Sequence, residues 1–353
     1  MKLFEFDDYK FVDKTKPNSN YGLGYVGSKN LIVEDLMMCF PKAKNFYDLF
    51  AGGCSVSHYA ILSGKYKNYY INDLDGQPIE LFENAIKGKY KNETRWISRE
   101  DFEKLKDTDV YVSYVWSFGN NGKCYMYSRE IEPYKKARHY AIVFDDWSLM
   151  KELCSEVVDY IKEKLNGYCD LKLRRLRFGQ SVVRKLKELN DCSIVVNNPL
   201  YKSCHWRGGK LDDDFYVDLE SLQSLESLQS LERLERLQSL ERLQSLEIDN
   251  IKFSNLSYDE IEIKDDSVIY CDIPYFNTVD YKIGSFDYDK FYNWCKNQKQ
   301  ITFVSSYELP EDKFSLVKEF NKNSTFQSGA KFRKERLYIP IHQKNVMNYN
   351  GLF

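Results

Sequence analysis

The sequence lacks the features of a membrane or secreted protein. Its longest apolar runs, such as residues 268–271, span only a few positions, far below the ~18 that a transmembrane helix requires. Glu5, Asp7 and Asp8 lie where a secretory signal would carry basic residues and an apolar stretch. These absences predict a cytoplasmic protein that does not associate with a membrane.

The sequence also lacks the residue spacing of a metal site. The nine cysteines form no CxxC pair, and the four histidines give no zinc-ligand spacing. An odd number of scattered cysteines does not indicate a disulfide framework, so we expect reduced thiols and no metal. The glycine turn at residues 48–55 contains neither GxGxxG nor GxxxxGK[ST], which argues against a nicotinamide dinucleotide or a nucleoside triphosphate there.

The composition is that of a folded globular protein. Hydrophobic residues make up 43% and charged residues 29% of the 353 positions, which excludes wholesale disorder. At ~150 residues per domain, this length predicts about two domains, or one domain with a large insertion. The net charge of −2 means that a nucleic-acid partner must bind to a local basic surface.

The first 85 residues predict two consecutive strand–turn–helix units. Residues 45–50 form an apolar, aromatic strand that ends in the small-residue turn 51–53, and a helix is expected from residue 55. A second strand over residues 68–71 is followed by a helical pattern over residues 78–85. Two such units in succession favour an α/β fold with a doubly wound parallel sheet.

Strands return near the end of the chain. Residues 248–263 are β-rich, residues 267–271 form a buried strand, and residues 300–305 form another. The sequence therefore predicts one α/β core, built from residues 1–90 and 251–353 and interrupted by a mainly helical insertion.

The insertion contains a basic segment without acidic residues, residues 172–187. Its basic side chains are Lys172, Arg174, Arg175, Arg177, Arg184, Lys185 and Lys187. Two interpretations are open: a phosphate-contacting element, or the solvated face of an amphipathic helix.

The insertion also contains a leucine repeat. Ten leucines recur at every third position from Leu219 to Leu246. Each step turns an α-helix by about −60°, so the leucines circle the axis and do not form a coiled-coil seam. We expect a helix over residues 219–247 that serves either as a spacer or as a partner surface, including one for self-association.

Two strand ends carry residues suited to cofactor binding. Residues 48–55 (DLFAGGCS) place a glycine turn at the carboxyl end of a strand, where open α/β sheets bind ligands. Asp73 follows the next strand, at a point where a carboxylate can hold ribose hydroxyls. An ordinary Asn-Asp turn is the alternative for Asp73.

Residues 272–275 (DIPY) follow the buried strand and suit the activation of an amine. The exocyclic amine of a base is a poor nucleophile because its lone pair is delocalised into the ring. The Asp272 carboxylate and the Ile273 carbonyl could accept its two hydrogens and prepare the nitrogen to attack a methyl group. Tyr275 could stack on a base extracted from the duplex, and Pro274 would stiffen the turn. The alternative is a simple strand-end turn.

These motifs together resemble the adenine-specific DNA methyltransferases of the Dam-like type, which use S-adenosylmethionine. Four stretches carry the resemblance in the order that the family shows: YVGSK at 25–29, DLFAGGCS at 48–55, NDLD at 72–75 and DIPY at 272–275. The insertion matches only loosely, chiefly at residues 121–125.

The resemblance implies a Rossmann-like methyltransferase sheet. Residues 1–90 would form its cofactor-binding part, residues 91–250 a target-recognition region that binds double-stranded DNA, and residues 251–353 its catalytic part. The positions assigned to the cofactor are Tyr25, Gly27, Ser28, Lys29, Asp48, Phe50, Ala51, Gly52, Gly53, Asp73 and Asp272. The catalytic positions are Asp272, Ile273, Pro274 and Tyr275. The candidates for DNA contacts are Lys123, Arg174, Arg175 and Arg177.

The implied reaction is direct methyl transfer from S-adenosylmethionine to a flipped-out adenine, without a metal or a covalent intermediate. Two positions depart from the family pattern. Cys54 replaces a glycine, which strains the turn if φ is positive there. Ile273 replaces the first proline of DPPY, although it still supplies a backbone carbonyl.

Two other classes of function stay open on the sequence. The same fold could methylate a cytosine amine in DNA, an adenine in RNA or a glutamine amide in a protein. The aspartate at the start of the motif and the large insertion favour a DNA base. A non-catalytic DNA-binding or interaction protein is the second alternative, in which the departures at Cys54 and Ile273 mark lost activity.

Overall fold

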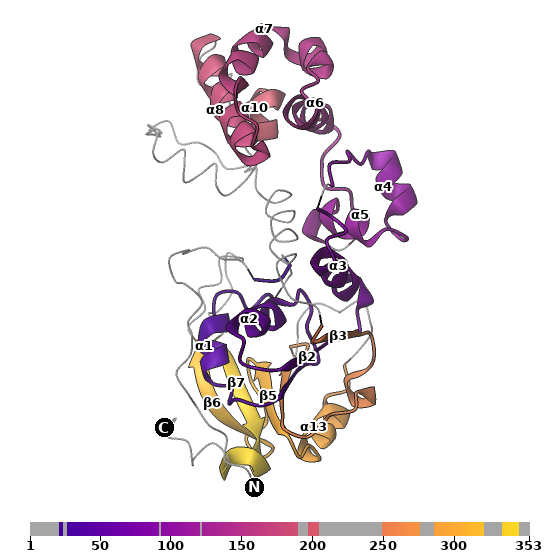
Figure 1. Ribbon diagram of the computed structural model, residues 1–353, viewed down its shortest axis with the longest axis vertical. Helices are drawn as coiled ribbons and strands as arrows, with labels where there is room; N and C mark the ends of the chain where they lie inside the picture. The colour runs from indigo at the N-terminus through magenta and orange to yellow at the C-terminus, as the bar shows by residue number, and fades with distance from the viewer. Residues whose placement is uncertain are drawn as a thin grey trace. The chain divides into compact units, whose positions relative to one another are not determined.

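The computed structural model describes residues 21–23, 27–91, 93–120, 122–189, 197–204, 249–275, 286–320 and 334–345. The chain divides into two compact units (Figure 1). Residues 1–91 and 239–353 form the first, which we call the α/β unit, and residues 92–238 form the second, which we call the helical unit. Tyr25 and the leucine repeat lie outside the described residues.

The α/β unit contains a seven-stranded sheet. Its strands are β1 (Asn45–Asp48), β2 (Asn68–Asn72), β3 (Ile251–Ser254), β4 (Ser267–Asp272), β5 (Ile301–Ser306), β6 (Phe314–Phe320) and β7 (Glu335–Pro340). Their order is β3-β2-β1-β4-β5-β7-β6. The first five in this order pair in parallel, whereas β7 pairs antiparallel with both β5 and β6.

This topology confirms the predicted α/β fold and adds one feature. From β1 the chain winds outward through β2, and from β4 it winds in the opposite direction to β5. The point of reversal lies between the neighbours β1 and β4, and ligands bind at such switch points in open α/β sheets. The antiparallel pair β6–β7 was not predicted. In the predicted β-rich stretch 248–263, only β3 is a strand, followed by the short helix η2 (Tyr258–Glu260).

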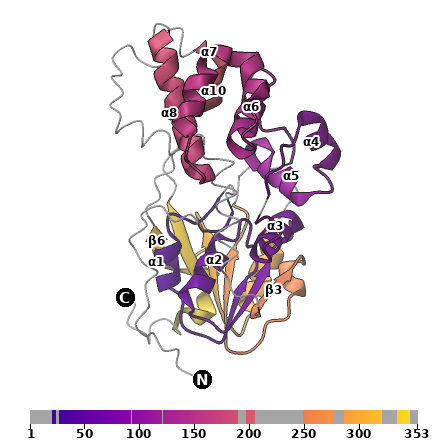
Figure 2. The same ribbon diagram turned by 45° about the horizontal axis from the view of Figure 1, so that its top comes forward.

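Helices cover both faces of this sheet. They are α1 (Val33–Met38), α2 (Ser55–Ser63), α3 (Gly76–Ile86) and α13 (Tyr288–Lys296), with the short helix η3 (Ile341–Gln343) after β7. Phe46 and Phe303 pack against Phe40 on one face. Tyr47 lies on the other face, in a cluster with Phe291 of α13. Consecutive strand residues point to opposite faces, so burial of both 46 and 47 gives a three-layer core. Figure 2 shows α1 and α2 in front of the strands.

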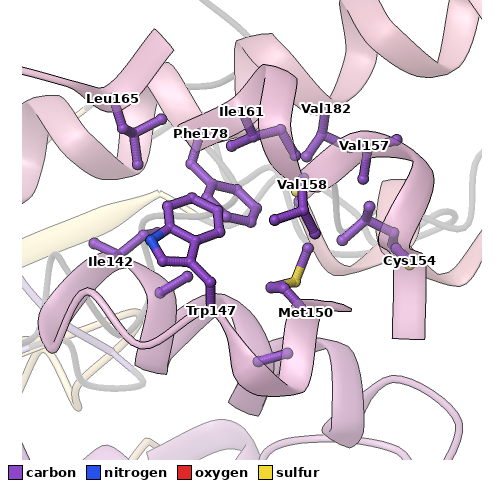
Figure 3. Close-up of a cluster of buried hydrophobic side chains, with 14 of the residues drawn as sticks. Ile142, Trp147, Met150, Cys154, Val157, Val158, Ile161, Leu165, Phe178 and Val182 are labelled. Carbon is purple, nitrogen blue, oxygen red and sulfur yellow. The ribbon is translucent and has the colours of Figure 1, made fainter. Parts of the chain in front are cut away.

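The helical unit contains α4 (Arg99–Leu105), α5 (Val110–Val115), η1 (Phe118–Asn120), α6 (Glu132–Val143), α7 (Ser148–Leu165), α8 (Leu171–Leu189) and α10 (Pro199–Cys204). Its core lies among α6, α7, α8 and α10 (Figure 3). Trp147 stacks on Phe178, with ring centroids 6.2 Å apart. Buried residues recur on α8 at Phe178, Val182 and Leu186, at helical spacing. The predicted basic segment therefore belongs to an amphipathic helix with one face in this core.

Candidate active site

The glycine turn after β1 begins the site. The Ala51 N–H donates to the Asn72 carbonyl at 2.9 Å, and the Cys54 N–H donates to the Ala51 carbonyl at 2.7 Å. Cys54 adopts φ 59° and ψ 27°, the left-handed conformation that favours glycine. Because φ is positive at Cys54, the turn is strained there. The left-handed conformation costs a non-glycine residue about 1 kcal/mol.

The N-terminal segment packs directly on this turn. The Leu23 N–H donates to the Gly53 carbonyl at 2.7 Å, and the Lys29 N–H donates to Ser55 Oγ at 3.3 Å. Gly22 has φ +68°, and a Cβ there would come within 2.3 Å of the Gly53 carbonyl oxygen, so only glycine fits. These contacts fix the backbone that carries Lys29.

Two carboxylates lie at the ends of β1 and β2. Ser57 Oγ donates to Asp48 Oδ2 at 2.6 Å, and burial raises the pKa of Asp48 to about 7. Asp73 accepts the Gly52 N–H at 2.7 Å and the Asp75 N–H at 2.8 Å. Burial nevertheless raises the pKa of Asp73 to about 6. The glycine turn and the acidic strand end thus hold each other in place.

An ion pair joins the first and the last of the four sequence motifs. Lys29 Nζ lies 2.6 Å from Asp272 Oδ2, and the exposed fractions of the two side chains are 3% and 22%. The same ammonium donates to the Gly27 carbonyl at 3.2 Å. The carboxyl ends of β1, β2 and β4 therefore bring the glycine turn, Asp73, Lys29 and Asp272 to one edge of the sheet.

Two residues at this edge were missed by the sequence analysis. The Tyr275 hydroxyl lies within hydrogen-bond distance of both Asp272 Oδ1, at 3.2 Å, and Glu335 Oε1. The ring of Tyr307 lies 4.3 Å from that of Tyr275, measured between centroids. Glu335 is the first residue of β7, flanked by Lys334 and Arg336, and no local motif marks it. Because β7 runs antiparallel to β5, its first residue lies at the edge where the parallel strands end.

Carboxylates outnumber ammonium groups at the site. Its carboxylates are Asp48, Asp73, Asp272 and Glu335, and its ammonium is Lys29. Burial raises the pKa of Asp272, with Lys29 lowering it and Glu335 raising it. Burial also holds the pKa of Tyr275 well above its usual range, so this phenol stays protonated. An excess of buried negative charge favours a cationic ligand.

The other predicted site residues differ in burial and in contacts. The Ile273 side chain is buried in the core cluster on the α13 side, and the Pro274 carbonyl accepts a hydrogen bond from the Tyr288 hydroxyl at 3.0 Å. The Phe50 ring packs against Tyr258 and other aromatic rings of that cluster, so its contacts are those of a core residue. Ser28 is half-buried and accepts the Asn30 N–H.

The four DNA-contact candidates all belong to the helical unit. The Arg174 guanidinium donates to the carbonyls of residues 141, 142 and 168 and to Asp145, at 2.9 to 3.3 Å. It thereby ties α8 to the end of α6. Arg175 is half-buried, whereas Lys123 and Arg177 are exposed. The geometry thus separates Arg174, whose donors are occupied, from the exposed Arg177 on the same helix.

The family comparison agrees with this site. Residues 25–166 match the family model of the D12 class N6 adenine-specific DNA methyltransferases. The matched part is 142 of the 353 residues. No curated protein matches the chain. Enzymes of this family transfer a methyl group from S-adenosylmethionine to the exocyclic amine of adenine in DNA, and the match supports the same activity for this chain. The match includes Lys29, the glycine turn and Asp73, but ends before residues 272–275.

The residues at the strand ends of the α/β unit fit S-adenosylmethionine chemically. Asp48 Oδ1 is buried without a hydrogen-bond partner among the described residues, and such an acceptor is satisfied by a cationic donor. The cofactor carries a sulfonium and an ammonium, which match the excess of carboxylates, and its ribose hydroxyls suit Asp73. Within the described ranges there is no cluster of potential metal ligands, and no described helix is long and apolar enough to cross a membrane.

Proposed function

We propose that the edge formed by β1, β2 and β4 is the methyl-transfer site of this DNA methyltransferase. The observation that carries the proposal is the 2.6 Å ion pair between Lys29 and Asp272. It joins a residue inside the matched part of the chain to the DIPY motif outside it. A buried ion pair of this kind needs both partners, because either charge alone would be costly at this position.

Asp272 and the Ile273 carbonyl accept the two hydrogens of the adenine amine in this proposal. Two acceptors withdraw the hydrogens from the plane of the base and localise the nitrogen lone pair. When bound, S-adenosylmethionine supplies an electrophilic methyl group. Asp73 holds the ribose hydroxyls, and Asp48 and the glycine turn orient the rest of the cofactor. The protein thereby contributes positioning and electrostatic stabilisation.

The target adenine is flipped out of the duplex, since its amine is paired inside the base stack. Tyr275 offers an aromatic ring for stacking on the extruded base, and its half-buried position beside Asp272 supports this role. Ile273 at the second position of the motif is compatible with activity, because the group required there is a backbone carbonyl.

The helical unit recognises the DNA target in this proposal. Its exposed cations Lys123 and Arg177 are suited to contacts with phosphates or base edges, whereas Arg174 stabilises the unit. The leucine repeat, proposed as a self-association surface, lies outside the described residues. A cytoplasmic location stays a prediction, supported by the DNA substrate of the family.

Methyl incorporation tests the proposal. The purified protein is incubated with labelled S-adenosylmethionine and unmethylated genomic DNA, and the nucleosides of the digest are analysed. Label is expected in N6-methyldeoxyadenosine. Asp272→Asn should reduce the rate by about 10³-fold or more, because the amide no longer offers a charged acceptor. Label in methylcytosine would overturn the base assignment.

A matched control is Asp289→Asn on α13, an exposed carboxylate 87% accessible to solvent, which should keep the full rate. Asp289→Asn should also bind labelled S-adenosylmethionine and DNA within about 3-fold of wild type. For Asp272→Asn the single-turnover rate is measured at saturating cofactor and DNA, so that weaker binding does not contribute to the loss in the chemical step. A fully active Asp272→Asn enzyme would show that methyl transfer occurs elsewhere.

A further inference from the structure

A second buried carboxylate faces the reacting edge, and neither the sequence motifs nor the family match includes it. The Glu335 side chain is 1% exposed, and its Oε1 lies 3.8 Å from Lys29 Nζ. It also accepts a hydrogen bond from the Tyr275 hydroxyl. A carboxylate is buried at a cost of several kcal/mol unless its partners compensate, so these contacts need an explanation beyond packing.

The Tyr275 hydroxyl has one proton for two carboxylates. It lies within hydrogen-bond distance of Asp272 Oδ1 and Glu335 Oε1, and it can donate to only one of them at a time. When the proton goes to Glu335, Asp272 Oδ1 keeps its lone pairs for the adenine amine. Without a charged acceptor at position 335, the phenol would donate to Asp272 and compete with the substrate.

The ammonium of Lys29 is shared in the same way. It lies 2.6 Å from Asp272 and 3.8 Å from Glu335, and it lies 5.1 Å from the centre of the Tyr275 ring. The Glu335 carboxylate adds negative potential at Asp272 that partly offsets the positive potential of the ammonium, and this leaves Asp272 the stronger hydrogen-bond acceptor.

The other groups around Asp272 add no further cation among the described residues. Asp48 on β1 and Asp73 after β2 interact with it as carboxylates, and the Tyr270 hydroxyl on β4 is bonded to Ser305 of β5 at 2.9 Å. Burial raises the pKa of Asp272, Lys29 lowers it, and the like charge of Glu335 raises it further. Glu335 is thus one of a few groups that set how strongly Asp272 accepts a hydrogen.

We propose that Glu335 is a positioning residue for methyl transfer: it takes the Tyr275 proton and shares the Lys29 ammonium, which leaves Asp272 open to the adenine amine. This inference rests on the proposed roles of Asp272 and Tyr275. Glu335 does not touch the substrate, and its effect passes through the two side chains that it binds.

The test is Glu335→Gln, which keeps the shape and removes the charge. The single-turnover rate of methyl transfer should fall about 10- to 100-fold, with the affinities for S-adenosylmethionine and DNA within about 3-fold of wild type. The acid midpoint of the pH–rate profile should move to lower pH by about half a unit to one unit, because Asp272 loses a neighbouring negative charge and gains the phenol proton. Glu335→Asp, which retains the charge, should keep most of the wild-type midpoint.

If Glu335→Gln folds poorly, Glu335→Asp decides instead, since it keeps the charge and should keep the wild-type midpoint. A double variant tests the competition for Asp272 directly. Tyr275→Phe preserves the stacking ring and removes the competing hydroxyl. Combined with Glu335→Gln, it should give an enzyme no slower than Glu335→Gln alone, because the competition for Asp272 has been removed. Glu319→Gln serves as the control, since Glu319 pairs with Lys334 and Arg336 away from Asp272 and should not move the midpoint.

Two outcomes would overturn the inference. The first is a Glu335→Gln enzyme with the rate and the acid midpoint of wild type. The second is a Glu335→Gln enzyme that is slower but has the wild-type midpoint, and whose rate loss simply adds to the loss in Tyr275→Phe. A merely structural role of Glu335 would give this second result. Failure of the proposed active site looks different, because Asp272→Asn would then retain activity. An inactive Asp272→Asn beside a normal Glu335→Gln would reject only the role of Glu335.

Discussion

At the scale of single residues, the site concentrates negative charge that the folded α/β unit accommodates at a cost. Asp48 is the clearest case: it is buried, Ser57 donates to its Oδ2, and its Oδ1 has no partner among the described residues. Burial raises its pKa from 3.8 to about 7. In the cofactor-free protein, such a group makes the free energy of unfolding depend on pH.

The sign of this coupling follows from proton binding. Because the pKa of Asp48 is higher in the folded state than in the unfolded state, the folded protein binds more protons between about pH 4 and about pH 7. Its free energy of unfolding should therefore fall as pH rises through this window and level off above about pH 7. A shift of about 3 units corresponds to at most about 4 kcal/mol. Urea denaturation between about pH 5 and about pH 8 measures this change in the free energy of unfolding.

Asp48→Asn is the matched control for that experiment. The amide oxygen can still accept from Ser57, but it does not titrate, so the stability of the variant should depend less on pH over the same window. Surface carboxylates contribute equally to both proteins and cancel in the difference. Parallel pH profiles of wild type and variant would contradict the assignment of the shift to Asp48.

Some properties of single residues could be predicted from the sequence, and others depend on tertiary packing. The family pattern drew attention to Cys54, and its positive φ is confirmed. Arg174 and Arg177 were equivalent in sequence, both basic and three positions apart. The packing of α8 against the end of α6 decides which guanidinium is occupied by carbonyls, and that arrangement is a tertiary property.

At the scale of elements, strands followed by turns were predictable because short apolar runs and small-residue turns encode them locally. β1, β2, β4 and β5 lie within one or two residues of the predicted positions. β7 was not predicted, and with it Glu335 was missed. Its sequence, ERLYIP, follows a basic stretch, and the Ser-Gly turn signal at residues 328–329 lies several positions earlier, so only the pairing of β7 with β5 brings Glu335 to the site.

The ends of the parallel strands are held together by one buried amide, that of Asn72. Its Nδ2 donates to the Leu49 and Leu256 carbonyls at 3.1 and 3.0 Å. Its Oδ1 accepts from Ser254 Oγ at 2.9 Å and from the Leu256 N–H at 3.0 Å. This side chain therefore links β2 to both neighbouring strands at the edge that carries the site.

Asn72→Ala should destabilise the protein by about 2–4 kcal/mol, because four hydrogen bonds are lost and buried backbone groups lose their partners. Asn72→Asp should do no better, since a carboxylate would face two carbonyl oxygens. The comparison is Asn255→Ala, an exposed amide with bonds to the carbonyls of Asp73 and Leu74, which should cost about 1 kcal/mol or less. Thermal unfolding of the three variants measures these losses of stability. Equal losses at positions 72 and 255 would contradict the role of Asn72 in holding the strand ends together.

At the scale of the whole molecule, the chain separates chemistry from a candidate DNA-binding surface. The proposed catalytic residues belong to the α/β unit, and the candidate DNA contacts belong to the helical unit. The sequence placed the change of character near residue 90, where alternating strand and helix patterns give way to helices. The family resemblance and the exposed cations of the helical unit support its proposed role in DNA binding.

The two roles should separate experimentally. Arg177 and Arg184 are both exposed on α8, and seven residues correspond to about two helical turns, so they lie on one face. If both contact phosphates, Arg177→Gln with Arg184→Gln should weaken DNA binding and reduce the slope of log affinity against log salt by about 2. The affinity for S-adenosylmethionine should not change. Arg174→Gln should instead lower thermal stability, because it removes the hydrogen bonds between α8 and α6. An unaltered salt slope in the double variant would exclude this face of α8 from the DNA interface and leave the remaining exposed cations of the helical unit, such as Lys123, as the next candidates.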